Sequence, residues 1–176
     1  FWDSHAGAGP RSTPILNQGK VFAMGGTGIL TVVDARDGTY LWSRDAASET
    51  GIESRDWGFA SSPLVVNNLV LVAVSGKLLA YNIHTGEKAW EAPDGGESWS
   101  SPHLLNIDGV DQVVFMSSEG ASAYQVEDGR VLWEYAWPGA QIVQPALCAN
   151  GDLMLSAGNA RGIGRFTVTR ESGEWR

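Results

Sequence analysis

The chain has 176 residues, of which 43% are hydrophobic and 18% charged, and its formal net charge is −8. This composition excludes a disordered chain, which combines low hydrophobicity with high net charge. It also argues against a nucleic-acid partner, which requires a basic surface. No apolar run reaches the roughly 18 residues that cross a bilayer, so no transmembrane segment is predicted. The length fits one domain over residues 1–176.

A pattern of apolar segments recurs four times along the chain. Each unit opens with a proline at the start of an apolar segment, where a strand loses no ladder N–H. Two further β-rich segments and a turn glycine follow. The prolines are Pro14, Pro63, Pro102 and Pro145, and the glycines are Gly38, Gly86, Gly129 and Gly173. Repeats of about 40–45 residues with four strands each are typical of β-propeller blades.

The units predict four blades in chain order, at about residues 11–45, 60–92, 99–136 and 142–176. In the first blade we expect strands at 13–16, 20–24 and 29–34, with a last strand near residue 42. The second and third blades repeat this order, and the fourth is expected to be truncated. No segment has the 3.6-residue periodicity of an amphipathic helix. The predicted fold is therefore an all-β propeller of four-stranded antiparallel blades.

Three of the units carry a tryptophan four places after the turn glycine: Trp42, Trp90 and Trp133. We expect each to lie on the outermost strand of its blade and to cover the neighbouring blade. A tryptophan side chain buries about 150–250 Å² in such a position. Together with Gly38, Gly86 and Gly129, these residues are the predicted blade-docking set.

Residues 80–90 resemble the repeat motif of the pyrroloquinoline-quinone-type (PQQ-type) propellers, Ala-x-Asp-x-x-Thr-Gly-x-x-x-Trp. The match is complete except for Asn82, which stands in place of Asp. The first unit keeps Asp34 but departs at two positions, the third has Gln125 at the Asp position, and the fourth unit is weakest. The resemblance implies a ring of six to eight blades, so missing blades or a second copy would close it.

The family resemblance leaves the activity open. Members include quinone- and calcium-dependent alcohol dehydrogenases, an outer-membrane assembly lipoprotein that acts as a scaffold, and cofactor-free repeat proteins. The resemblance implies a periplasmic or extracellular location. The quinone enzymes use Glu, Asn and Asp at the calcium, and many have an adjacent cysteine pair. Here Cys148 stands alone, so the sequence requires no cofactor, and PQQ and calcium enter by resemblance only.

A candidate ligand site lies in the loops between blades, because propellers generally bind ligands at that rim. Three tryptophans there do not belong to the repeat. They predict either a stacking surface for a protein or a small planar or sugar-like ligand, or packing that seals the loops, which is the commoner arrangement. The candidate rim residues are Arg55, Asp56, Trp57, Glu97, Trp99, Trp137, Gln141 and Arg161.

No catalytic set emerges from the remaining polar residues. Asp56 and Glu97 with Asn159 could in principle bind calcium, although solvated loop carboxylates are the favoured interpretation. The histidines are scattered, with no catalytic triad or metal spacing. We therefore predict a non-catalytic binding or scaffolding module. The alternatives are a fragment of a quinone- and calcium-dependent alcohol dehydrogenase and a sensor domain of a signalling protein.

Overall fold

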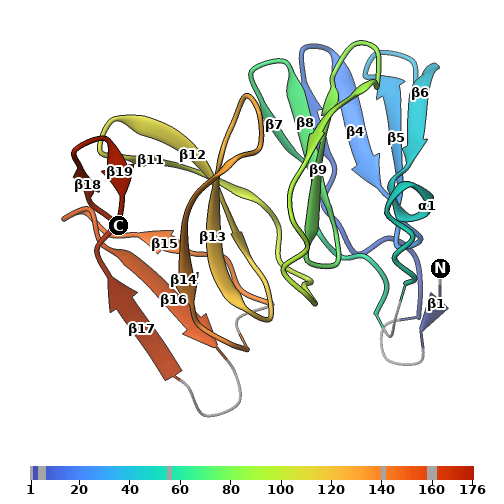
Figure 1. Ribbon diagram of the computed structural model, residues 1–176. Helices are drawn as coiled ribbons and strands as arrows, with labels where there is room; N and C mark the ends of the chain where they lie inside the picture. Colours follow the sequence, from blue (N-terminus) through green and yellow to red (C-terminus); the bar gives the residue numbers. More distant parts are fainter. Residues whose placement is uncertain (1, 4–6, 55–56, 140–141, 158–161) are drawn as a thin grey trace.

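The computed structural model describes residues 2–3, 7–54, 57–139, 142–157 and 162–176, and these residues form the predicted all-β fold (Figure 1). Three sheets have four antiparallel strands each, joined in sequence order as meanders. The strands of the first are β3 (Ile15–Asn17), β4 (Lys20–Met24), β5 (Ile29–Asp34) and β6 (Tyr40–Asp45). Those of the second are β7 (Leu64–Val66), β8 (Leu69–Val74), β9 (Lys77–Asn82) and β10 (Lys88–Glu91). Those of the third are β11 (His103–Ile107), β12 (Val110–Met116), β13 (Gly120–Gln125) and β14 (Val131–Ala136).

The fourth unit differs from the other three. Its sheet has three strands, which are β15 (Ala146–Leu147), β16 (Leu153–Ala157) and β17 (Gly162–Phe166). The chain then enters a separate hairpin of β18 (Arg170–Glu171) and β19 (Glu174–Trp175), with Gly173 in its turn. Near the N-terminus, β1 (Trp2–Asp3) pairs with β2 (Gly7–Ala8) in another short hairpin.

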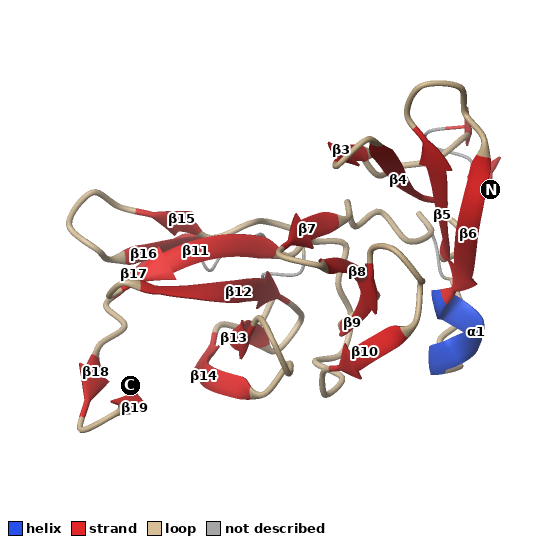
Figure 2. Ribbon diagram, turned by 90° about the horizontal axis from the view of Figure 1, so that it is seen from above, coloured by secondary structure: helices blue, strands red, loops and turns tan. Residues whose placement is uncertain are grey.

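The sheets follow one another without closing into a ring (Figures 1 and 2). The first strands β3, β7 and β11 lie side by side. Alternation along each strand sends one set of side chains toward the preceding sheet and the other toward the next. Three buried clusters result, one for each pair of neighbouring sheets. Large apolar members of these clusters include Phe22, Tyr81, Phe115, Met116 and Leu155.

A pair of hydrogen bonds links the segments that lead into β3, β7 and β11. The backbone N–H of Thr13 donates to Ser62 Oγ at 2.9 Å, and the N–H of Ser62 donates to Ser101 Oγ at 2.9 Å. Each of these residues directly precedes the proline that opens its blade. The hydroxyls of Ser62 and Ser101 therefore position the start of one blade against the start of the next. The recurring Thr-Pro and Ser-Pro pairs were the sequence signal for this contact.

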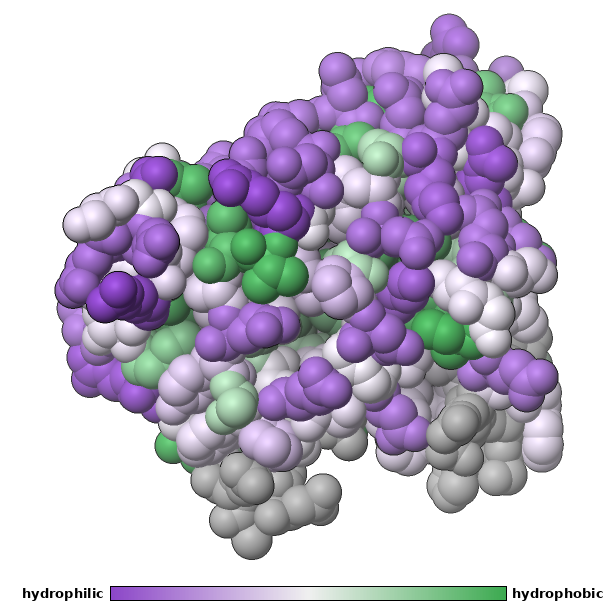
Figure 3. All heavy atoms as spheres, in the orientation of Figure 1, coloured by the Kyte–Doolittle hydropathy of each residue, from purple (hydrophilic) through white to green (hydrophobic). Residues whose placement is uncertain are grey.

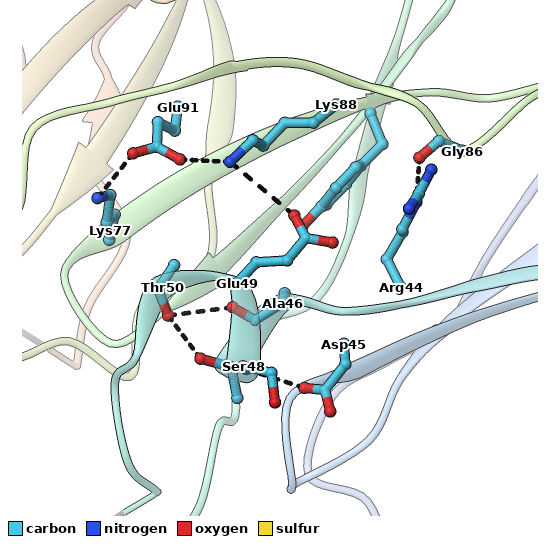
Figure 4. A network of polar contacts seen from close by, with 12 residues as sticks. Arg44, Asp45, Ala46, Ser48, Glu49, Thr50, Lys77, Gly86, Lys88 and Glu91 are labelled. Atoms are coloured by element: carbon cyan, nitrogen blue, oxygen red, sulfur yellow. Dashed lines mark hydrogen bonds and ion pairs between the residues drawn. The ribbon is translucent and has the colours of Figure 1, made fainter.

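A short helix, α1 (Ala46–Thr50), fastens the first sheet to the second (Figure 4). Asp45 caps it by accepting the N–H of Ser48 at 3.0 Å. On its exposed side Glu49 accepts the Tyr81 hydroxyl at 3.1 Å and lies 4.0 Å from Lys88 Nζ. Burial, and then the adjacent Glu49 carboxylate, raise the pKa of the Tyr81 phenol. The phenol therefore stays protonated and remains a donor.

The same network predicts an acid-dependent contribution from Glu91. Hydrogen bonds from Lys88, at 2.7 Å, and from Lys77, at 2.9 Å, lower the pKa of Glu91 to about 2 from 4.5. Because the folded-state pKa lies below the unfolded one, the stabilisation is present above pH 4.5 and is lost as the pH falls toward 2. Glu91→Gln should cost less than about 1 kcal/mol at pH 7, since solvent screens the exposed pair. Urea unfolding of the wild-type chain and of Glu91→Gln should show a smaller difference in the free energy of unfolding at pH 3 than at pH 7. A difference that stays constant would contradict the assignment of this stabilisation to the Glu91 carboxylate.

Candidate functional site

A cleft of about 510 Å³ opens at the rim of the first three sheets. Its walls come from the loop after α1, the β8–β9 turn and the loop between β10 and β11. In a meander the second-to-third strand turn and the loop to the next sheet emerge at the same end, which is the end that holds α1 in Figure 1. The polar and aromatic lining residues include Glu53, Phe59, Ser75, Asp94, Glu97 and Trp99.

Two of the predicted rim tryptophans meet beside this cleft. The ring centroids of Trp57 and Trp99 lie 5.1 Å apart with an interplanar angle of 59°. Trp57 is 42% exposed, and Trp99 is half-buried and lines the cleft. Phe59, which also lines the cleft, is buried at 4% exposure. The two tryptophan rings therefore contact each other, and Trp57 also presents aromatic surface to solvent.

The wall that carries Trp99 is held by turns from two sheets. The N–H of Gly76 donates to Gly96 O at 2.8 Å, and the N–H of Gly95 donates to Gly76 O at 3.1 Å. A Cβ at Gly76 would overlap the backbone of Gly96, so this close approach requires glycine. Ser98 Oγ donates to Met116 O at 2.6 Å on the third sheet. The loop 94–98 is therefore pinned between the β8–β9 turn and β12.

The polar lining of the cleft is acidic. Glu53, Asp94 and Glu97 contribute carboxylates, and none of the described lining residues is a lysine or arginine. Asp94 Oδ1 accepts the N–H of Gly96 at 2.9 Å, which orients this carboxylate along the wall. Sequence reasoning found Glu97 but missed Glu53 and Asp94, because their part in the cleft depends on how the two loops meet.

Trp137, a further predicted rim residue that the structure describes, does not line this cleft. Trp137 packs between the third and fourth sheets, where it stacks on Tyr135 with ring centroids 6.3 Å apart. A Cβ at Gly164 would lie 2.9 Å from Trp137 Cη2, so that glycine makes room for the indole. For Trp137 the contacts are those of a packing residue. Arg55, Asp56, Gln141 and Arg161 lie outside the described residues.

The repeat tryptophans are buried between sheets, at 9%, 8% and 7% exposure for Trp42, Trp90 and Trp133. Trp42 Nε1 donates to Ile83 O at 3.3 Å and Trp90 Nε1 to Val126 O at 3.0 Å, both on the following sheet. The glycines that follow these acceptors, Gly86 and Gly129, face the two indoles.

Trp133 makes a different hydrogen bond, donating to Gln112 Oε1 on its own sheet at 2.7 Å, while its ring meets Phe166 edge-on. Its N–H is therefore satisfied within the third sheet. The contribution of the three indoles to stability remains a prediction.

Across the described parts of the chain, no group of three His, Cys, Asp or Glu side chains is placed to hold a metal ion. Two of the three oxygen donors considered from sequence, Asp56 and Asn159, lie outside those parts. Within the described residues, no helix has the length and apolarity needed to cross a membrane.

Comparison with known proteins gives the family of this chain. The sequence model of the family described as outer membrane protein assembly factor BamB matches residues 1–176. BamB of Shewanella oneidensis is 30% identical over 149 residues, covering 76% of this chain and 36% of the relative. The quinoprotein alcohol dehydrogenase PedH of Pseudomonas putida is 29% identical over 134 residues, covering 71% of this chain and 22% of the relative. The chain thus spans about a third or less of these two relatives.

Solved structures agree on the fold. BamB from Moraxella catarrhalis superposes with a TM-score of 0.63 at 18% identity, covering 92% of this chain and 51% of that one. The computationally designed Ika4 protein gives a TM-score of 0.63 at 13% identity and covers 95% of both chains. Together with the whole-length family match, the sheets, the meander order and the repeat motif show that the chain belongs to the BamB-like family of PQQ-type repeat propellers.

Proposed function

We propose that this chain is a non-catalytic binding module that holds a polypeptide partner in the cleft beside Trp57 and Trp99. The observation that carries the proposal is the tryptophan pair at a cleft of about 510 Å³, in which Trp99 lines the cleft and Trp57 is 42% exposed. Exposed tryptophans at preformed hollows are typical of the residues that dominate protein–protein binding energy. The pinned loop 94–98 supports this role, because an ordered wall loses little conformational entropy on binding.

The family supports a binding role over catalysis for this chain. Relatives are described as assembly factors for outer membrane proteins, and by analogy we place this chain in the periplasm. The chain also matches quinoprotein dehydrogenases, so the dehydrogenase alternative needs a direct test. Further blades or a second copy would cover the outer faces of the first and fourth sheets. Exposed apolar side chains there include Leu16, Ile29, Met154 and Ile163.

The binding role is tested by selecting nine-residue peptides from a random phage-displayed library against the chain. Kd values of the recovered peptides are then measured by tryptophan fluorescence. We expect Trp99→Ala to raise Kd about tenfold or more, as for a central interface tryptophan. Tyr40→Ala is the matched control, because Tyr40 is 62% exposed and starts β6 at the opposite rim. It should change Kd by less than about twofold.

Three results would contradict the proposed function. If Trp99→Ala and Tyr40→Ala raised Kd equally, or if the library gave no enriched peptide, the cleft would not be a polypeptide-binding site. Dye-linked alcohol oxidation after reconstitution with the quinone and Ca²⁺ would instead show that the chain is catalytic.

A further inference from the structure

We propose that the segment bound in this cleft presents a lysine or arginine side chain to Glu53 and Asp94, alongside the indole of Trp99. The inference rests on the proposed polypeptide-binding role of the cleft and specifies the chemistry of the partner. The hollow of about 510 Å³ falls within the 300–1,000 Å³ typical of ligand sites, enough for a long side chain and adjoining backbone.

The charge of the two cleft loops favours a cationic partner. Residues 51–59 and 93–99 together carry four carboxylates and one guanidinium, a net charge of −3 within a chain of net charge −8. Hydrophilic side chains also cover most of the face seen in Figure 3. A hollow lined by one sign of charge concentrates ligands of the opposite sign and speeds their association. An acidic segment would meet repulsion in the same place.

The carboxylates stand where a side chain entering the cleft can reach them. Asp94 uses Oδ1 for the N–H of Gly96, and its Oδ2 makes no hydrogen bond to any described residue. Glu53, on the loop after α1, lines the same cleft and has no ion pair within the described ranges. A charged head between these two carboxylates would form charge-assisted hydrogen bonds, which are stronger than neutral ones.

The tryptophan wall suits the rest of such a side chain. Lysine and arginine lay their aliphatic stems along apolar surface while the charged end stays near polar groups. A cation over an indole face also gains electrostatic attraction, which is largest for tryptophan among the aromatic residues. Among the described residues, the Arg170 guanidinium makes a contact of this kind, 5.4 Å from the ring centroid of Trp175. In the cleft, Trp99 offers the same kind of surface beside two carboxylates.

The test uses three acetylated, amidated pentapeptides, Val-X-Val-X-Val with X as Arg, Ser or Glu, titrated against the whole chain by tryptophan fluorescence. At low salt we expect the Arg peptide to bind about tenfold or more tightly than the Glu peptide, with Ser between them. The advantage should shrink at 1 M salt, where the Debye length is about 3 Å. Equal affinity of the Ser and Arg peptides would overturn the cationic preference. It would leave polypeptide binding intact, and so separate the two proposals.

Variants that neutralise the cleft carboxylates test whether they cause the preference for the Arg peptide. The double variant Glu53→Gln with Asp94→Asn should remove most of the Arg preference, and Asn keeps the oxygen that accepts from Gly96. The control pair Asp108→Asn with Glu127→Gln changes the net charge equally at the opposite rim and should leave the preference unchanged. If both double variants lost the preference for the Arg peptide equally, the preference would come from the net charge of the chain and not from the cleft. The proposal would also be overturned if none of the three peptides bound. The same holds if argininamide bound as tightly as the Arg peptide.

Discussion

Replacing Trp90 by alanine should lower the free energy of unfolding by about 3–5 kcal/mol. Trp90 is 8% exposed, lies in the core between the second and third sheets, and donates to Val126 O at 3.0 Å. Burial of about 150–250 Å² at roughly 25 cal/mol/Å² gives about 4–6 kcal/mol as an upper bound. The alanine variant also leaves a cavity that the surrounding β-sheets cannot readily collapse to fill.

Urea unfolding followed by circular dichroism measures this loss, with Trp2→Ala as the matched control. Trp2 is 68% exposed, so its replacement should change the free energy of unfolding by less than about 0.5 kcal/mol. If Trp90→Ala lowered the free energy of unfolding by less than about 1 kcal/mol, the indole would contribute little to the packing of the two sheets. That result would contradict its docking role.

The repeat made the sheets predictable because its signals are local. A proline that tolerates the start of a strand, alternating apolar residues and a glycine in a tight turn all act within a few residues. The structure accordingly has four-stranded meanders around β4–β5, β8–β9 and β12–β13. The fourth unit has the weakest motif, and it is the one whose sheet has three strands, followed by the β18–β19 hairpin.

The cleft was only partly predictable, because its walls depend on contacts between distant segments. Trp57 and Trp99 stood out as tryptophans outside the repeat, and they do meet. Asp94 carries no such signal: its position follows from the pairing of Gly76 with Gly95 and Gly96, 19 and 20 residues further along the chain. Trp137 matched the same sequence pattern yet packs on Tyr135 and Gly164. Loop composition alone does not separate an aromatic residue that lines a cleft from one that fills a core.

Trp133 shows how one polar side chain redirects a repeated contact. At the positions equivalent to Gln112, the first and second sheets have Lys20 and Leu69. Gln112 is fully buried and accepts the indole N–H, which the other two tryptophans give to a backbone carbonyl of the next sheet. A glutamine directly before the apolar run 113–116 of β12 was the available sequence signal for this difference.

Gly129→Ala should destabilise the chain considerably more than Gly38→Ala, although both glycines occupy the same turn of the repeat. Their φ angles are +70° and +76°, so an alanine pays a similar left-handed penalty of about 1–2 kcal/mol at each. At Gly129 a Cβ would also overlap the ring of Trp90, adding about 1–3 kcal/mol of overpacking. At Gly38 no described atom lies within 4 Å of the added Cβ.

Urea midpoints of the two variants isolate the indole contact, because the backbone penalty cancels between them. We expect Gly129→Ala to lose about 2–5 kcal/mol and Gly38→Ala about 1–2 kcal/mol. Equal losses would mean that the turn conformation alone explains the recurring glycine. A clear difference would tie the glycine to its tryptophan, and would make Gly38 the position where the indole of a preceding sheet would pack if further blades extend the array beyond β3–β6.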